Sequence, residues 1–99
     1  MDTSIAVEQL TVAVRAELLK AVSDPTRLEM LDLLSSGERC NCHFQDHLDL
    51  APNLLSYHLR VLREAGLIVG SRRGRWVDYR LAPDAAELLA TALPAGLQR

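Results

Sequence analysis

The feature that most constrains the fold is a segment interrupted by proline between residues 40 and 67, CNCHFQDHLDLAPNLLSYHLRVLREAGL. Its first part, from Cys40 to Leu48, has apolar residues one helical repeat apart at Phe44 and Leu48. Pro52 cannot continue a preceding helix and disfavours helical geometry in the residue before it, but it is well tolerated in the first turn of a new helix. The segment therefore predicts two helices joined by a tight turn.

The second of these helices, expected from Pro52 to Ala65 and capped by Gly66, has an apolar and a polar side. At about 100° per residue, the apolar side, which we expect to be buried, consists of Leu55, Leu59 and Leu62. The polar side consists of Asn53, Ser56, Tyr57, Arg60 and Glu64. These side chains include donors and acceptors of the kind that read base edges and phosphates in the major groove of DNA. The alternative is an ordinary solvated helix face.

A hairpin with a basic tip is expected after this helix. Two runs rich in β-forming residues flank a glycine-containing turn within residues 67–81. The tip carries three arginines, Arg72, Arg73 and Arg75. Like charges this close repel one another without an anion, so a phosphate backbone or a narrow minor groove is the expected partner, and a plain soluble turn is the alternative. Trp76 and Tyr79 are expected to anchor the hairpin to the helices.

The rest of the chain favours a single, mainly α domain over residues 1–99. A chain of 99 residues buries a modest fraction of its surface, so dimerisation would stabilise it. An amphipathic helix is expected at each end, over residues 4–22 and 83–93. Between them, residues 23–25 begin a further helix, on which Arg27 is expected to reach a phosphate or to pair with a carboxylate. The core side of that helix is expected to consist of Leu28, Leu31 and Leu34.

Charge is distributed unevenly along the chain, although the formal net charge is only −2. Residues 54–80 hold six arginines against two acidic residues and therefore carry +4, whereas the remaining residues carry −6. Such an asymmetry would orient the molecule on a polyanion with the second helix and the hairpin forward.

Neither a membrane protein nor an enzyme is indicated. No apolar run approaches the length that spans a bilayer, and no basic and then apolar leader follows Met1, so a cytoplasmic location is expected. The sequence also has no evident pairing of a nucleophile with a base, no phosphate-binding loop and no paired acids. We therefore expect a binding protein and no catalytic residues.

Cys40 and Cys42 are the only cysteines, and they begin the first helix of the pair. A structural disulfide between thiols one residue apart is not expected in a reducing cytoplasm. The dipole at a helix N-terminus favours the thiolate, which is the form that binds soft metals and metalloids. The alternative, two small residues that fill a core, fits poorly with Arg39 and Asn41 as neighbours.

Histidines near the thiols could complete a metal site. His43 and His47 are four residues apart and share a helix side with Cys40, so one or both could add nitrogen ligands for Cd, Zn or Cu(I). The candidate metal ligands are Cys40, Cys42 and His43, whereas His47 is expected to be an exposed polar residue. His58 flanks the buried side of its own helix, where a structural hydrogen bond is expected.

Four stretches of the chain resemble, in order and spacing, landmarks of the ArsR/SmtB family of metal- and metalloid-sensing repressors. They are residues 24–28 (DPTRL), 40–42 (CNC), 56–67 (SYHLRVLREAGL) and 74–81 (GRWVDYRL). The resemblance implies a mainly α winged helix-turn-helix with a β-hairpin wing, homodimeric through its terminal helices, on an inverted-repeat operator. It also implies that the Cys-x-Cys binds arsenite, antimonite, cadmium or lead, which distorts its helix and releases the DNA.

The chain departs from the family pattern at the ligands beyond the thiol pair. Gln45 stands where the arsenite-sensing pattern has a third cysteine. Residues 1–22 contain neither the cysteine nor the histidine that a site of the cadmium and lead type would need. The zinc-type site on the last helix is absent, because no histidine follows Arg80.

The sequence therefore predicts a cytoplasmic, homodimeric transcriptional repressor that a thiophilic ion releases from its operator, As(III) or Sb(III) first, and Cd, Pb or Zn next. With His58 included for its match to the Ser-x-His-Leu landmark of the family, the expected DNA-binding residues are Asn53, Ser56, Tyr57, His58, Arg60, Arg72, Arg73 and Arg75. One alternative is a DNA-binding regulator that senses oxidation through its thiols. Another is a zinc-stabilised protein interaction module, which would not bind duplex DNA in a salt-dependent manner.

Overall fold

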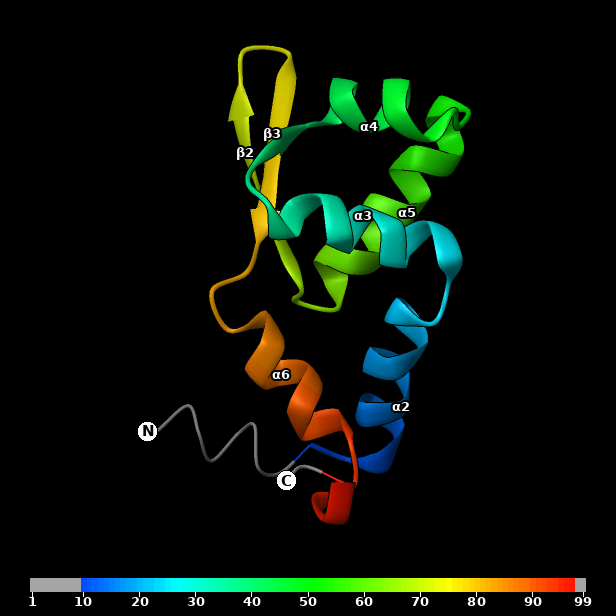
Figure 1. Cartoon of the computed structure of the whole chain (residues 1–99), viewed down its shortest axis with the longest axis vertical. Coiled ribbons are helices and arrows are strands. Elements are labelled where there is room, and N and C mark those ends of the chain that lie inside the picture. Colours follow the sequence, from blue (N-terminus) through cyan, green and yellow to red (C-terminus); the bar gives the residue numbers. More distant parts are fainter. Residues whose placement is uncertain (1–9, 98–99) are drawn as a thin grey trace.

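A computed structural model of the chain describes residues 10–97 and is mainly helical. In chain order, its elements are α2 (Val12–Val22), α3 (Pro25–Ser35), β1 (Arg39–Cys40), α4 (Asn41–Leu48), α5 (Pro52–Glu64), β2 (Ile68–Arg73), β3 (Trp76–Leu81), α6 (Ala85–Ala92) and a short 3-10 helix (Ala95–Leu97). The hairpin of β2 and β3 lies with α4 and α5 at one end of the molecule, and α2 and α6 lie at the other end (Figure 1). Within residues 10–97, no helix is long and apolar enough to cross a membrane.

The first two helices begin at side-chain caps. Thr11 Oγ1 accepts a hydrogen bond from the backbone N–H of Val14, so α2 begins at Val12, and the expected turns before residue 10 lie outside the described residues. Asp24 caps α3 by accepting the Arg27 backbone N–H at 3.0 Å, with Pro25 in the first turn. The predicted start of α3 is confirmed.

The proline-interrupted segment forms the predicted pair of helices. α4 ends at Asp49, whose φ of 50° lies in the left-handed region, and α5 begins at Pro52. The predicted inner side of α5 is buried, and it consists of Leu55, Leu59 and Leu62. Gly66, with a φ of 82°, ends α5 as predicted, because the N–H of Leu67 then reaches the Leu62 carbonyl at 3.1 Å.

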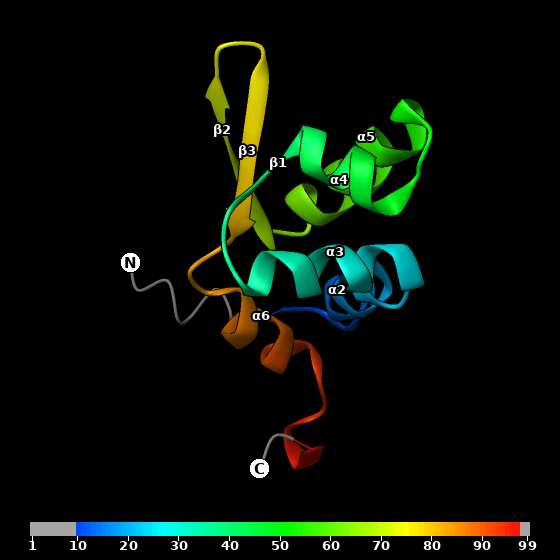
Figure 2. The ribbon, with the colours of Figure 1, turned by 45° about the horizontal axis from the view of Figure 1, so that its top comes forward.

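The core lies where α3, α4 and α5 pack on the sheet (Figure 2). Its largest fully buried side chains are Met30, Phe44, Leu62, Leu67 and Ile68. The expected core side of α3 is wrong at Leu28, which is 51% exposed. Arg27 and Met30 are buried in its place together with Leu34, because Arg27 turns inward to hydrogen-bond the end of α2.

The sheet has a strand that was not expected. β1 pairs antiparallel with β3, Arg39 opposite Tyr79 and Cys40 opposite Asp78, so the strand order is β1-β3-β2. The predicted anchoring of the hairpin is confirmed for Tyr79, which is buried with its ring centroid 6.5 Å from that of Phe44. Trp76 differs from the prediction. It is 38% exposed beside the turn, with the Arg75 guanidinium 5.3 Å from its ring centroid.

Candidate DNA interface and sulfur site

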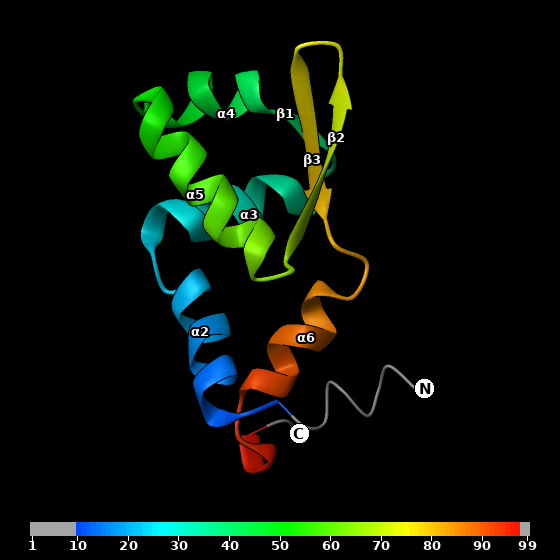
Figure 3. The same ribbon diagram turned by 180° about the vertical axis from the view of Figure 1, so that it is seen from behind.

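The α5 helix lies beside the hairpin (Figure 3), and the side chains of its polar side are exposed. Its exposed predicted residues are Asn53, Ser56, Tyr57 and Arg60. Leu54, which the helical pattern did not indicate, is also 48% exposed among them. An apolar side chain at this position could contact a thymine methyl group in a major groove.

His58, also predicted for this surface, is held from the interior by Arg27. The two side chains join Nη1 of Arg27 to Nδ1 of His58 at 3.0 Å. Arginine has donors only, so Nδ1 is the acceptor and the neutral imidazole carries its proton on Nε2. The expected structural hydrogen bond of His58 is confirmed. The expected ion pair of Arg27 with a carboxylate is not found among residues 10–97, and its guanidinium bonds instead to His58 and to the Ala21 carbonyl, the latter at 2.7 Å.

The three arginines near the hairpin turn have different environments. Arg73 donates from Nε and Nη2 to the Asp78 carboxylate at 2.7 and 3.0 Å. This pairing holds the pKa of Asp78 below its usual value and raises the pKa of Arg73. Arg75 lies over Trp76, and Arg72 is exposed without an ion pair to any residue between 10 and 97. The argument that all three repel one another without an external anion is therefore wrong for Arg73.

Two adjoining cavities are lined by residues of both α5 and the hairpin. The larger, about 400 Å³, is lined from α4, α5 and β3 and includes Arg60, Arg63 and Tyr79. The smaller, about 320 Å³, shares Arg63 and Tyr79 with it and adds Arg72. Arg63 therefore lies between the polar side of α5 and the hairpin, a position that the sequence pattern did not indicate. Its spacing of three residues from Arg60 could have indicated it.

Cys40 and Cys42 lie half-buried at the start of α4. The Sγ atom of Cys40 caps the helix by accepting the Cys42 backbone N–H at 3.1 Å. The two sulfurs are joined as a disulfide, contrary to the expectation of free thiols. The extended residue before the helix and the first helical turn place the two Cα atoms 5.2 Å apart, within the range that a disulfide spans.

The candidate nitrogen ligand His43 lies on the exposed side of α4. Its ring stacks on that of His47, with 5.7 Å between the centroids. His47 is exposed as expected, and its Nε2 lies 4.0 Å from a Glu29 carboxylate oxygen. In the described part of the chain, no group of three or more His, Cys, Asp or Glu side chains is arranged to hold a metal ion.

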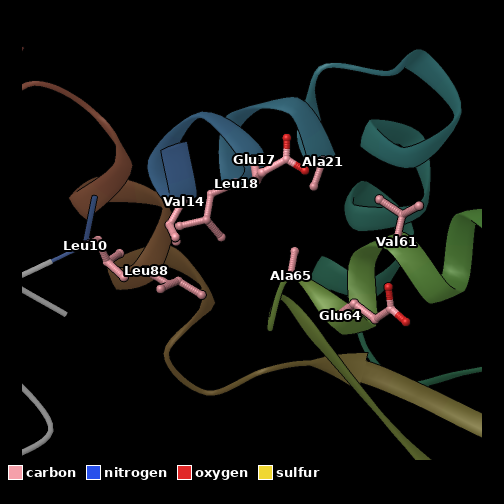
Figure 4. A pocket seen from close by; sticks show the side chains of 9 residues that line it. All are labelled: Leu10, Val14, Glu17, Leu18, Ala21, Val61, Glu64, Ala65 and Leu88. Atoms are coloured by element: carbon pink, nitrogen blue, oxygen red, sulfur yellow. The ribbon is translucent and has the colours of Figure 1, made fainter. Parts of the chain in front are cut away.

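A third cavity, about 350 Å³, lies at the end of the molecule away from the hairpin, between α2, α5 and α6 (Figure 4). Its lining is mostly apolar and includes Leu18, Ala65 and Leu88. Two carboxylates, Glu17 and Glu64, also lie along it. The α2 and α6 helices are linked near this cavity by Arg15, whose Nε donates to the Ala92 carbonyl at 3.4 Å.

A helix-turn-helix followed directly by an antiparallel hairpin defines the class of winged helix-turn-helix proteins. Residues 24–69, which contain α3, α4 and α5, match the family of bacterial regulatory proteins named arsR. The chain belongs to this arsR family of transcriptional regulators, which are not enzymes.

Individual relatives agree with this assignment. Over 68 residues the chain is 44% identical to the arsenical resistance operon repressor of Escherichia coli, covering 68% of this chain and 58% of that protein. It is 36% identical to the transcriptional repressor SdpR of Bacillus subtilis over 64 residues, 65% of this chain and 71% of SdpR. The crystal structure of a possible transcriptional regulator for arsenical resistance superposes with a TM-score of 0.69 at 37% identity, covering 74% of this chain and 76% of the other. The chain thus spans little more than half of the E. coli repressor.

Proposed function

We propose that this chain represses transcription by binding operator DNA through α5 and the β2–β3 hairpin, and that a thiophilic ion at Cys40 and Cys42 releases it. The observation that carries the proposal is the position of the two sulfurs at the N-terminus of the first helix of the helix-turn-helix. Because α4 packs directly on α5, a change at the start of α4 can reach the surface that reads the DNA. Arsenite and antimonite are the preferred effectors, and cadmium, lead and zinc follow.

The chemistry of the pair supports a soft ion once the disulfide is reduced. A thiol reductant supplies two electrons and two protons, is itself oxidised to a disulfide, and yields two thiols on this chain, which can ligate through sulfur as thiolates. Trivalent arsenic would bind both sulfurs, with its third position left to water, to His43 or to a group from another chain. The similarity to a repressor named for arsenical resistance favours arsenic among the soft ions.

Fluorescence anisotropy on duplex DNA from upstream of the gene tests the proposal. The reduced protein should bind tightly and with a steep dependence on salt. Arsenite should weaken this binding by about 10- to 100-fold, the usual range of allosteric coupling. A Cys40→Ser, Cys42→Ser double variant should bind DNA equally well and keep its affinity in arsenite.

Two further variants sharpen the ligand assignment. His43→Gln should reduce the affinity for the ion if His43 is the third ligand, whereas the matched control His47→Gln on the same helix side should not. Unchanged release of DNA by arsenite and by cadmium in the double cysteine variant would exclude the sulfur pair as the effector site.

Dimerisation is part of the same proposal. The α2 helix and the C-terminal segment expose large apolar side chains, which are Val12, Val14, Leu19 and Leu97. The α2 helix and the C-terminal segment lie at the end of the molecule away from the hairpin, so an interface there would leave the hairpin of both copies free to contact DNA (Figure 1). A two-fold pair through this face would bind an inverted repeat.

A second candidate function is favoured by the disulfide itself. In this reading peroxide oxidises the two thiols to the disulfide and is reduced to water, and oxidation is the signal. Metal-free protein would then change its affinity for DNA on addition of hydrogen peroxide and recover on addition of a reductant. The first candidate requires instead that the reduced protein respond to arsenite without any oxidant.

A further inference from the structure

Asn41, the residue between the two cysteines, connects the sulfur site to the hairpin. Its side-chain Oδ1 accepts a hydrogen bond from the backbone N–H of Val77 in β3 at 3.2 Å. The Sγ atom of Cys40 lies 3.5 Å from the same oxygen. Among residues 10–97, no hydrogen bond of the Asn41 side chain goes to α5. The amide thus touches a sulfur on one side and the hairpin on the other.

The backbone next to Asn41 is tied to the same part of the hairpin. Cys40 stands opposite Asp78 in the pairing of β1 with β3. The carboxylate of Asp78 in turn holds Arg73 through two hydrogen bonds. Val77 and Asp78 are consecutive residues of β3 that contact Asn41 and Cys40. Asp78 also holds Arg73 of the hairpin through its carboxylate.

We propose that Asn41 is a positioning residue that transmits the state of the sulfur pair to the hairpin. The inference rests on the proposed function of Cys40 and Cys42 as the effector site. A sulfur that binds an ion as a thiolate carries negative charge, which repels the amide oxygen 3.5 Å away, whereas a sulfur of the neutral disulfide does not. The amide then leaves the Val77 N–H, the edge pairing of β1 loosens, and the hairpin shifts relative to α5.

The chain carries its own reporter for this movement. Trp76 is the only tryptophan, and it is the first residue of β3, next to Val77. It is partly exposed with Arg75 against its ring, so its emission depends on the conformation of the hairpin. The movement can therefore be followed without DNA.

The experiment titrates the reduced full chain with arsenite while Trp76 emission is recorded, and it measures occupancy of the sulfurs separately by the ultraviolet absorbance of arsenic bound to thiolate. In the wild type, the emission should change in proportion to occupancy. Asn41→Asp keeps an oxygen acceptor for Val77 and should keep the response. Asn41→Ala lacks it, and the factor by which arsenite weakens DNA binding should fall by about 3- to 10-fold, as expected for the loss of one hydrogen bond.

Two controls isolate the contact. Gln45→Ala removes an amide on the same helix whose hydrogen bond goes to the Leu50 carbonyl at 3.5 Å and not to the hairpin within residues 10–97, and it should respond as the wild type does. The Cys40→Ser, Cys42→Ser variant should show no emission change, which excludes a direct effect of arsenite on Trp76. Circular dichroism verifies that each variant is folded. The change in Trp76 emission of the wild type tests the inference without any substitution.

The outcomes separate this inference from the proposed function. Arsenite that occupies the sulfurs and releases DNA while Trp76 stays silent would overturn the inference alone. A full response in Asn41→Ala would do the same. Failure of arsenite and cadmium to bind the wild-type sulfurs would overturn the proposed function and the inference with it.

Discussion

Arg27 joins parts of the chain that are distant in sequence. Its Nε donates to the Ala21 carbonyl at 2.7 Å and its Nη2 to the Lys20 carbonyl at 3.4 Å, while Nη1 meets His58. The side chain is only 8% exposed. Composition and spacing could not predict this role, because an arginine on a helix offers the same five donors to a phosphate, a carboxylate or a carbonyl, and only the folded chain selects among them.

Arg27→Met should reveal the contribution of these contacts. The substitution keeps most of the volume but leaves the Ala21 carbonyl and His58 without the arginine donor, so the free energy of unfolding should fall by about 2 kcal/mol. Urea denaturation measures the change. The matched control Arg72→Met, at an exposed position, should stay within about 0.5 kcal/mol of the wild type. Equal stability of both variants would mean that the guanidinium contacts make no net contribution.

Asp24 gives a prediction that depends on pH. Its pKa lies below the usual value because its carboxylate accepts the backbone N–H of Arg27. The stabilisation is therefore complete above the pKa of the unfolded chain, about 3.9, and is lost as the pH falls through the lower pKa of the folded state. Asp24→Ala should be less stable than the wild type by about 1 kcal/mol at pH 7, and denaturation in stronger acid should show a smaller difference.

At the scale of elements, the helix boundaries and the hairpin follow from local signals in the sequence. Pro52, Gly66 and Asp24 act on the backbone within a few residues, so their effects on α5 and α3 were predicted. β1 is two residues long and exists only through its pairing with β3, so no periodicity could indicate it. The link between Asn41 and Val77 spans 36 positions and was hidden for the same reason.

The hairpin arginines should differ in their contribution to DNA binding. Arg72 has no ion pair within the described part of the chain. Arg72→Gln should therefore make the fall of log affinity with log salt concentration shallower, by about 0.9 in slope for one lost phosphate contact. Arg73 already pairs with Asp78, and Arg73→Gln should leave that slope nearly unchanged. Anisotropy titrations at several salt concentrations measure both slopes. A larger change in slope for Arg73→Gln than for Arg72→Gln would show that the ion pair of Arg73 with Asp78 breaks when DNA binds.

At the scale of the whole molecule, the two ends have different proposed roles. The end with α4, α5 and the hairpin carries the candidate DNA surface, and the end with α2 and α6 carries the proposed dimer interface (Figure 1). The sequence predicted this division from the terminal amphipathic patterns and the placement of arginines. It could not predict the cavity between α2, α5 and α6, because a cavity depends on how three separate helices meet.

The proposed dimer predicts a melting temperature that rises with protein concentration, because association stabilises only the folded chain. Val12, 75% exposed on α2, belongs to the proposed interface. Val12→Glu should weaken dimerisation by at least about tenfold in analytical ultracentrifugation and remove the concentration dependence. Leu28→Glu changes an exposed apolar residue on α3 and should behave as the wild type. A monomeric wild type at all concentrations would exclude the interface.

The tie made by Arg27 has a consequence for the operator. It fixes the end of α2 against α5. In a dimer through α2, the distance between the two α5 helices would therefore depend on this buried contact in each chain. Half-sites must match that distance, and one added base pair moves a half-site by about 3.4 Å along the duplex and rotates it around the axis. Arg27, although buried inside the chain, would thus help to determine the half-site spacing of the inverted repeats that the protein can bind.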